Sequence, residues 1–484
     1  MILALPLLPL VGALVLLGIP SHRQNLLRFV AILSTGLSFL ITVALFAAFQ
    51  AGKPGYQFYH SIPWLPSWGI HYQVGVDGIS MTLCLLHALV SFAGAFMAVK
   101  TKDRLKDYLF FYLLLVAPIY GVFTSLNIFF LYVFYEMTLI PLYPMIGIWG
   151  SKNKEYGAMK LTIYITAGAM LSLFGIMLLY REMGSATFDL VKTGEMLRAA
   201  PLTPGFQKVT AGLFLAGFGV IASLWPLHSW SPIGYAAAPT SVSMLHAGVL
   251  KKMGPYLVIR FAIAFLPEGV KAWSPLLASL AGIGVLYAAF AAIRQRDLKF
   301  MVGFSSVSHM GYVLLGLAAM TQTSVAGAVM LMFSHGVMAA CFFALIGFLY
   351  EQAHTRGVTD FGGLGKTMPF IAVCFVMTSL ASLGLPGFSN FAAELLVFIG
   401  SWSSFPLIVG LGVFAILITA IYLLRAVQSV CYGPTDPKWK DLKDAVSLAD
   451  KFPFVLLLGA LLLFGFWPQG LLRLLLPAVA GVLP

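Results

Sequence analysis

Long runs of apolar residues dominate this sequence and limit the folds open to it. A helix that crosses the hydrocarbon core of a bilayer needs about 20 consecutive apolar residues. Fourteen such runs succeed one another along the chain, near 1–19, 26–49, 77–99, 107–124, 126–149, 157–180, 209–231, 239–265, 273–293, 299–320, 322–349, 368–404, 405–428 and 453–482. We therefore predict an all-α integral membrane protein with about 14 transmembrane helices. The last run contains Pro468 and Gly470, so it is either one tilted helix or two short ones.

Composition supports the membrane class and excludes several others. Of the 484 residues, 60% are hydrophobic and 10% charged, against roughly 25% charged in a soluble domain. The four cysteines are scattered with no CxxC pair, which argues against a disulfide framework, an iron–sulfur cluster or a zinc site. No glycine-rich phosphate-binding motif is present. The first run lacks a charged leader, so we interpret it as a retained helix and not a signal peptide.

Basic residues are grouped in alternate connections between the runs. Lys and Arg cluster after the first, third, fifth, ninth, eleventh and thirteenth runs, whereas the connections after the fourth, tenth and twelfth carry neither. Positive loops stay on the inner side of a membrane. The net charge of +12 is thus a topology signal and not a sign of nucleic-acid binding. The pattern predicts that both termini lie on the outer side.

Glycine and proline interrupt three of the runs. Pro226 and Pro232 lie in the seventh run, Gly254-Pro255 in the eighth, and Gly384 to Gly387 in the twelfth. Such breaks survive in a membrane only where protein or water satisfies the freed backbone, often along an ion path. The seventh and twelfth runs are five helices apart, which predicts two inverted five-helix repeats. The expected divisions are 1–106, 107–265 (first repeat), 266–428 (second repeat) and 429–484.

Two glutamates and a lysine pair stand alone inside apolar runs. Glu136 and Glu394 are single acids in their runs, and Lys251 and Lys252 lie in the middle of the eighth run. An ionisable residue at membrane depth is expensive, so each of them is a candidate for function. The alternatives are structural carboxylates satisfied by a neighbour, and lysines that extend to the interface from a helix that ends early.

Four histidines also fall within apolar runs: His228, His246, His309 and His335. A buried histidine is often only a hydrogen-bonded core residue, but imidazole is also suited to relaying protons. Asp77 opens the third run and is interpreted as a helix cap. Because the protonation of buried groups depends on nearby charge, a buried Glu, Lys and His set can load and eject a proton when a partner charge moves.

Seven segments carry a family resemblance. In chain order they are YQVGVDGISM, FFLYVFYEMTLIPLYPMIGIWG, WPLHSW, AAPTSVSMLHAGVLKKMG, RDLKFMVGFSSVSHMGYVLLGL, MFSHGVMAACFFALIGFLYE and ASLGLPGFSNFAAELLVF. Together they resemble the antiporter-like subunit M family of NADH-quinone oxidoreductase (respiratory complex I), whose relatives include mitochondrial subunit four and the Mrp antiporter subunits. The resemblance covers nearly the whole chain and implies fourteen helices with two inverted repeats.

The resemblance also implies roles for single residues. Glu136 matches the glutamate that the family pairs with a helix-7 lysine, and Lys252 matches its connecting lysine. His309 and His335 match histidines of the central polar axis, and Glu394 matches the exit glutamate. The implied function is proton translocation coupled to quinone reduction by NAD(P)H or ferredoxin.

One position departs from the family pattern. The family usually has a lysine five residues before the proline of its PLH segment, and that position here is Ile221. Lys251 and His246 are additional polar residues. Either Lys251 replaces the missing partner of Glu136 and the proton path is rewired, or the pair is lost and the subunit is a weak or silent pump.

Partners and cofactors follow from the resemblance. We expect other antiporter-like and small membrane subunits, a peripheral redox arm, membrane lipid and no nucleic acid. Flavin, iron–sulfur clusters and quinone are expected on partner subunits, with none on this chain and no metal. The expected location is a prokaryotic inner membrane or an equivalent energy-transducing membrane. Two alternatives remain: an Mrp-type cation/proton antiporter subunit, and a non-pumping structural subunit of the membrane arm.

Overall fold

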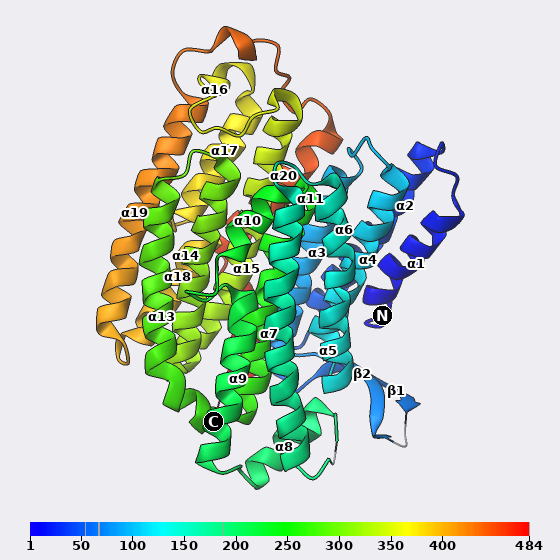
Figure 1. Ribbon diagram of the computed structural model, residues 1–484, viewed down its shortest axis with the longest axis vertical. Helices are drawn as coiled ribbons and strands as arrows, with labels where there is room; N and C mark the ends of the chain where they lie inside the picture. The colour runs from blue at the N-terminus through cyan, green and yellow to red at the C-terminus, as the bar shows by residue number, and fades with distance from the viewer. Residues whose placement is uncertain (54, 66–67, 186, 484) are drawn as a thin grey trace.

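The computed structural model is a bundle of long helices that run roughly parallel to one another (Figure 1). It describes residues 1–484 except 54, 66–67, 186 and 484. Within this described part, eleven helices are long and apolar enough to cross a membrane. The membrane fold predicted from the apolar runs is therefore confirmed, while the count of fourteen spans stays a prediction.

The N-terminal region contributes three helices and a hairpin. Its elements are α1 (Ala4–Gly18), α2 (Gln24–Ala48), β1 (Gln57–Leu65), β2 (Ile70–Val76) and α3 (Gly78–Ala98). The two strands pair antiparallel and form the only sheet of the described residues. A search for 20-residue apolar runs does not detect strands of this length.

The next stretch, which we call the first half, corresponds to the predicted first repeat. Its elements are α4 (Leu105–Thr124), α5 (Ile128–Met137), α6 (Leu139–Trp149), α7 (Lys154–Glu182), α8 (Leu190–Ala199), α9 (Pro204–Ala222), α10 (Trp230–Ala237), α11 (Thr240–Leu245), η2 (His246–Leu250), α12 (Lys251–Leu257) and η3 (Val258–Ile263). The fifth run is bent at Thr138, between α5 and α6. Pro141 explains the bend, since a proline cannot donate to the carbonyl of Met137 in the preceding turn.

The second half and the C-terminal region complete the bundle. Their elements are α13 (Pro267–Ile293), α14 (Leu298–Ala319), α15 (Gln322–Ala353), α16 (Leu364–Thr367), α17 (Pro369–Ser382), α18 (Ser389–Trp402), α19 (Pro406–Cys431), η4 (Pro437–Trp439), α20 (Leu448–Phe466) and α21 (Gln469–Ala480). The last apolar run is thus two helices, with Trp467 and Pro468 between them.

Two of the three predicted helix breaks are confirmed. A turn separates α9 from α10, and Ser223 at its start has a left-handed backbone. Another separates α17 from α18, where Gly384 and Gly387 both have positive φ. Glycine adopts this conformation without steric cost.

The third predicted break was wrong. Gly254 and Pro255 lie inside α12, and α11, η2, α12 and η3 follow one another without a loop. Gly254 serves close packing instead, because a Cβ there would lie 2.6 Å from the carbonyl oxygen of Phe218 in α9. The two π-helical stretches, η2 and η3, flank the short turn that carries Lys251 and Lys252.

The connections gather at two opposite ends of the bundle, as their charges predicted. At one end, Lys100 pairs with Asp450 at 2.7 Å, and Arg356 donates to Ser151. These contacts join connections that follow odd-numbered runs. At the other end, Asn127 bridges to Asp189. Figure 1 shows α16 near the first end and the hairpin with α8 near the second.

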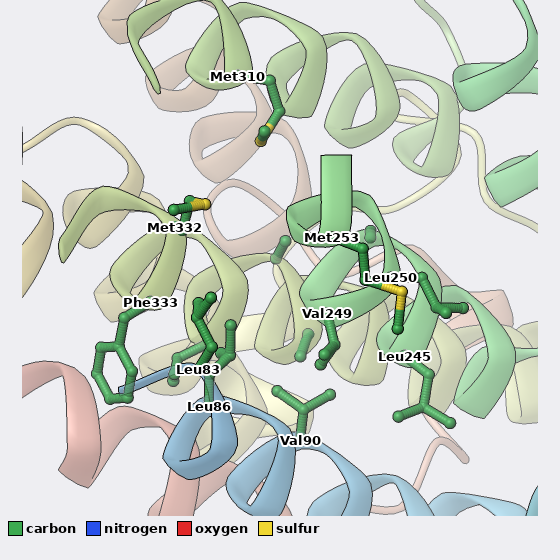
Figure 2. Close-up of a cluster of buried hydrophobic side chains, with 14 of the residues drawn as sticks. Leu83, Leu86, Val90, Leu245, Val249, Leu250, Met253, Met310, Met332 and Phe333 are labelled. Atoms are coloured by element: carbon green, nitrogen blue, oxygen red, sulfur yellow. The ribbon is translucent and has the colours of Figure 1, made fainter. Parts of the chain in front are cut away.

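The centre of the bundle is built around α3 and α15, whose membrane-length segments are almost fully buried. Apolar side chains from α3, the α11–α12 segment, α14 and α15 meet there (Figure 2). Two glycines allow η2 to approach α15: a Cβ on Gly336 would lie 2.4 Å from the carbonyl oxygen of Gly248. The lysine-bearing segment is therefore held against the second half by direct backbone contact.

Candidate functional site

A polar cluster in the second half lies where α14, α15 and the α17–α18 break meet. Nε2 of His309 is 3.7 Å from a carboxylate oxygen of Glu394. The rings of His309 and His335 are 5.1 Å apart. All three residues are at most 4% exposed. The structure therefore brings together three residues that are far apart in the sequence and that were predicted as site residues.

His309 has an acceptor on each side of its ring. Its Nδ1 is 2.8 Å from the carbonyl oxygen of Ser305, and its Nε2 is 3.1 Å from that of Ser382. A neutral imidazole can donate from only one nitrogen, whereas an imidazolium donates from both. The ring can therefore give a proton to either side, and the carboxyl of Glu394 lies near its Nε2.

The helix break shapes the surroundings of Glu394. The carboxylate is on α18, which starts after the break, and a Cβ on Gly384 would lie 2.5 Å from one of its oxygens. Only a glycine lets the turn pass so close to the acid. The irregular backbone predicted from the Gly and Pro spacing is thus part of the site.

The lysine pair is fully buried between the two halves. Lys251 donates to the hydroxyl of Ser306 on α14 at 3.3 Å, and its Nζ lies 5.6 Å from the ring centre of Tyr235. Lys252 donates to the carbonyl oxygen of Ala247. Both side chains are 0% exposed, which excludes the interpretation that they extend to the interface. Each is instead satisfied by uncharged oxygen and aromatic groups.

Three residues that sequence reasoning missed complete the cluster. The hydroxyl of Ser306 accepts a hydrogen bond from Lys251, and the backbone carbonyl oxygen of Ser305 bonds with Nδ1 of His309. The hydroxyl of Tyr422 donates to the hydroxyl of Ser305 at 2.8 Å. A signal was available: Ser305, Ser306 and His309 occur at helical spacing, so they share one face of a helix. Helix α14 therefore carries both the acceptor of Lys251 and the histidine that lies beside Glu394.

Glu136 in the first half stands apart from this cluster. It is half-buried on α5, and one of its carboxylate oxygens has no hydrogen-bond partner among the described residues. It makes no ion pair with Lys251 there, since Lys251 is directed to Ser306. His228 lies in the α9–α10 turn, with its ring 5.0 Å from that of Tyr287.

Ile221 lies at the end of α9, where the expected lysine is absent. Its side chain is 3% exposed and lines a small cavity together with His246 and Tyr135. The direct neighbours of the substituted position are therefore a histidine and a tyrosine, and Lys251 does not line this cavity.

Asp77 confirms its predicted role as a helix cap. Its carboxylate accepts from the backbone N–H of Ser80 and forms two bonds with the Arg260 guanidinium, at 2.7 and 2.6 Å. Burial alone would raise the pKa of Asp77, but Arg260 and Ser80 outweigh burial and hold the pKa below its usual value. This ion pair fastens α3 to η3 at the edge of the bundle and takes no part in the central cluster.

Comparisons with known proteins agree with this arrangement. The family model "NADH:quinone oxidoreductase/Mrp antiporter, TM" matches residues 125–419. NADH-quinone oxidoreductase subunit M of Rickettsia bellii is 33% identical, with 98% of this chain and 97% of that protein covered. The Rhodobacter capsulatus subunit M is 32% identical over 98% of this chain and 94% of that one.

Solved structures are similar over the full length. A chain of respiratory complex I from Thermus thermophilus has a TM-score of 0.89 and 30% identity, with 100% of both chains covered. A chain of the Mrp complex from a Dietzia species has a TM-score of 0.86, 20% identity, and coverage of 99% of this chain and 97% of that one. The second likeness shows a shared fold.

Proposed function

The chain belongs to the NADH:quinone oxidoreductase/Mrp antiporter family, and we propose that it is a proton-translocating, antiporter-like subunit in the membrane arm of a complex I-like NADH-quinone oxidoreductase. Its relatives in Rickettsia and Rhodobacter bear the name of subunit M of that enzyme. The enzyme activity belongs to the assembly, and this chain supplies the path through the membrane.

The observation that carries the proposal is a buried group of polar side chains between the two halves. Lys251 donates to Ser306 on α14, and on the same helix His309 lies 3.7 Å from Glu394 and beside His335. Buried groups that exchange protons must be within hydrogen-bond reach or be linked by one water. This group meets that condition at Lys251 and at His309, and the 3.7 Å gap to Glu394 can close with a small side-chain movement.

Each predicted site residue has a role in this proposal. Glu394 releases the proton at the end of the path, and His309 with His335 passes it on from the lysines. Lys252 is buried beside Lys251 in the same turn of α12 and adds its charge there. Lys251 serves as the connection to α14, Glu136 supplies charge in the first half, and His228 and His246 are relays.

The surroundings of the chain follow from its relatives. We propose that it assembles with other antiporter-like and small membrane subunits and with a peripheral redox arm that carries flavin, iron–sulfur clusters and the quinone site. The proposed location is a prokaryotic inner membrane or an equivalent energy-transducing membrane, with both termini outside. The alternating basic connections support this orientation.

An Mrp-type cation/proton antiporter subunit is the second candidate, because the fold is shared with a chain of the Mrp complex. Identifying the proteins that purify with the native chain distinguishes the two candidate assemblies. Redox subunits with flavin absorption support the complex I-like assembly, whereas a set of membrane subunits alone supports the antiporter.

Glu394→Gln tests the proposed function. Glutamine keeps the shape but cannot release a proton, so we expect proton uptake by vesicles containing the whole complex to fall by about tenfold or more. Lys366→Gln, in α16 at the end of the bundle, is the control and should leave proton uptake unchanged. Normal proton uptake by the Glu394→Gln complex, at normal assembly, would contradict the proposal.

A further inference from the structure

Several buried polar side chains at the α17–α18 break have no partner among the described residues. Both polar atoms of the Asn390 amide are buried without a hydrogen bond to any of those residues, and Asn390 is 0% exposed. The hydroxyls of Ser382 and Ser389, which end α17 and begin α18, are in the same condition. Leaving buried polar groups unsatisfied is costly, so apolar packing alone does not account for Asn390.

Asn390 and Glu394 share one face of α18. They are four residues apart in a continuous α-helix, which places their Cβ atoms about 5–6 Å from each other. Side chains at this spacing can form a hydrogen bond along the helix. The Glu394 carboxyl is not held tightly by His309, because the 3.7 Å between them is longer than a hydrogen bond. A small rotation of either side chain on α18 therefore brings the amide and the carboxyl together.

The packing of α18 on α15 places another unpartnered group at the level of Asn390. A Cβ on Gly327 of α15 would meet the backbone of Val397, and Gly400 meets α15 one turn earlier, so the two helices run antiparallel. Continuing this register by two turns brings Ser334 of α15 opposite Asn390. The hydroxyl of Ser334 is also buried without a partner in the described part of the chain. The amide thus has two neighbours to choose from, a serine across the interface and an acid on its own helix.

We propose that Asn390 is a positioning residue for Glu394, and that its amide N–H donates to the Glu394 carboxylate once the acid has released its proton. The inference rests on the proposed function, in which Glu394 releases the proton, and names the residue that adjusts this release. In this step the O–H bond of the Glu394 carboxyl breaks and its proton passes to water on the outer side. The amide keeps both of its hydrogens.

The other groups that face Glu394 are less able to act as this donor. The titratable side chains at this level are His309 and Tyr312 on α14, His335 on α15 and Tyr422 on α19. The two phenols already donate elsewhere, to the carbonyl oxygen of Gly412 and the hydroxyl of Ser305, and the two histidines belong to the proposed relay. Helix α17 has no charged residue, and those of α20 lie in its first turn, far from Gly465, which packs on the break.

The test measures the pH dependence of proton uptake by vesicles that contain the whole complex. A hydrogen bond donated to a carboxylate favours its charged form. Asn390→Leu removes the donor, so the carboxyl should hold its proton more tightly, and the acidic limb of the profile should move to higher pH by about one unit. Asn390→Ser retains a donor and should move the limb less.

Ser401→Ala is the matched control. Ser401 is a buried residue of α18 whose hydroxyl also has no partner among the described residues, but it lies about two turns beyond Glu394. Its loss should leave the pH profile unchanged. A merely structural role for Asn390 would lower proton uptake at every pH and leave the acidic limb in place.

A second measurement does not depend on the variants. An experimental map of the native complex, at a pH above the acidic limb, should show the amide nitrogen of Asn390 within hydrogen-bond distance of the Glu394 carboxylate. An amide bonded to Ser334 instead overturns the proposal. So does an acidic limb that stays in place in Asn390→Leu and Asn390→Ser while Glu394→Gln lowers proton uptake. If Glu394→Gln leaves uptake unchanged, the proposed function itself fails.

Discussion

Two buried histidines, His309 in the second half of the bundle and His246 in the first, have different surroundings. In the second half, His309 has an acceptor at each ring nitrogen and a carboxylate at 3.7 Å. In the first half, both nitrogens of His246 and one oxygen of Glu136 lack protein partners. The lysine pair stands between, with Lys251 bonded toward the second half through Ser306.

This difference separates two ways of handling a proton in a membrane. Where protein groups satisfy a charge, the charge is held in place and contributes to the stability of the fold. Where they do not, the group depends on water and its proton can exchange more freely. We infer that His309 holds its proton in place, whereas His246, like His335 beside His309, exchanges its proton more freely, and four substitutions test this comparison.

The largest expected effect is that of His309→Leu. The substitution removes the ring that bonds to the carbonyl oxygens of Ser305 and Ser382 and leaves Glu394 beside an apolar side chain, and each buried polar group left unsatisfied costs about 1–3 kcal/mol of unfolding free energy. Denaturant titration of the purified chain in detergent would measure this loss. The double variant His309→Leu/Glu394→Leu should recover part of it, because the carboxyl then no longer lacks a partner. A single variant as stable as the wild type would show that the pair is not held as described.

Ser306→Ala should have the next largest effect. It removes the hydroxyl that accepts from Lys251, and hydrogen bonds to charged groups contribute about 1.5–3 kcal/mol. The same denaturant titration measures this loss of unfolding free energy. Ser308→Ala is the control for serine loss on the same helix, since Ser308 bonds only to the carbonyl oxygen of Val285. Equal losses of unfolding free energy in the two variants would mean that the hydrogen bond from Lys251 contributes no more than that of Ser308.

Tyr422→Phe should lower the free energy of unfolding by a smaller amount. It removes one neutral hydrogen bond, to Ser305, worth about 0.5–1.5 kcal/mol. Because Ser305 would keep its backbone contact with His309, proton uptake should fall by less than in Glu394→Gln. Thermal unfolding of both variants, with proton uptake beside it, checks this order.

The smallest expected effect on stability is that of His246→Leu, about 0.5 kcal/mol or less, because its ring nitrogens have no protein partner to lose. A large loss of stability in this variant would contradict the described difference between the surroundings of His246 and His309. A small loss of stability together with impaired proton movement would support that difference.

Much of the fold was predictable because membrane helices and their breaks have strong local signals. Apolar runs, basic loops, the glycines near Gly384 and the prolines near Pro226 all have direct physical consequences. The isolation of Glu394 and of Lys251 within their runs was equally visible. These signals depend on residues close together in the chain.

The partners of the site residues were not predictable in this way. In one of the two alternatives Lys251 approaches Glu136, but η2 precedes Lys251. The extra residue in a π-helical turn rotates the helix that follows by about 100° relative to a regular α-helix. The acceptor of His309 at Ser382 depends on where α17 ends. Such contacts arise from tertiary geometry, which a single sequence does not encode locally.

The close contact between Gly248 and Gly336 has an evolutionary consequence. Both residues are glycines, which have no side-chain heavy atom, so neither would be identified as a site residue from its chemistry. Yet a single methyl group on Gly336 would push η2 away from α15 and shift Lys251 from Ser306. Lineages that keep this proton path must therefore keep both positions small, so the pair should co-vary in any descendant that relocates its lysines.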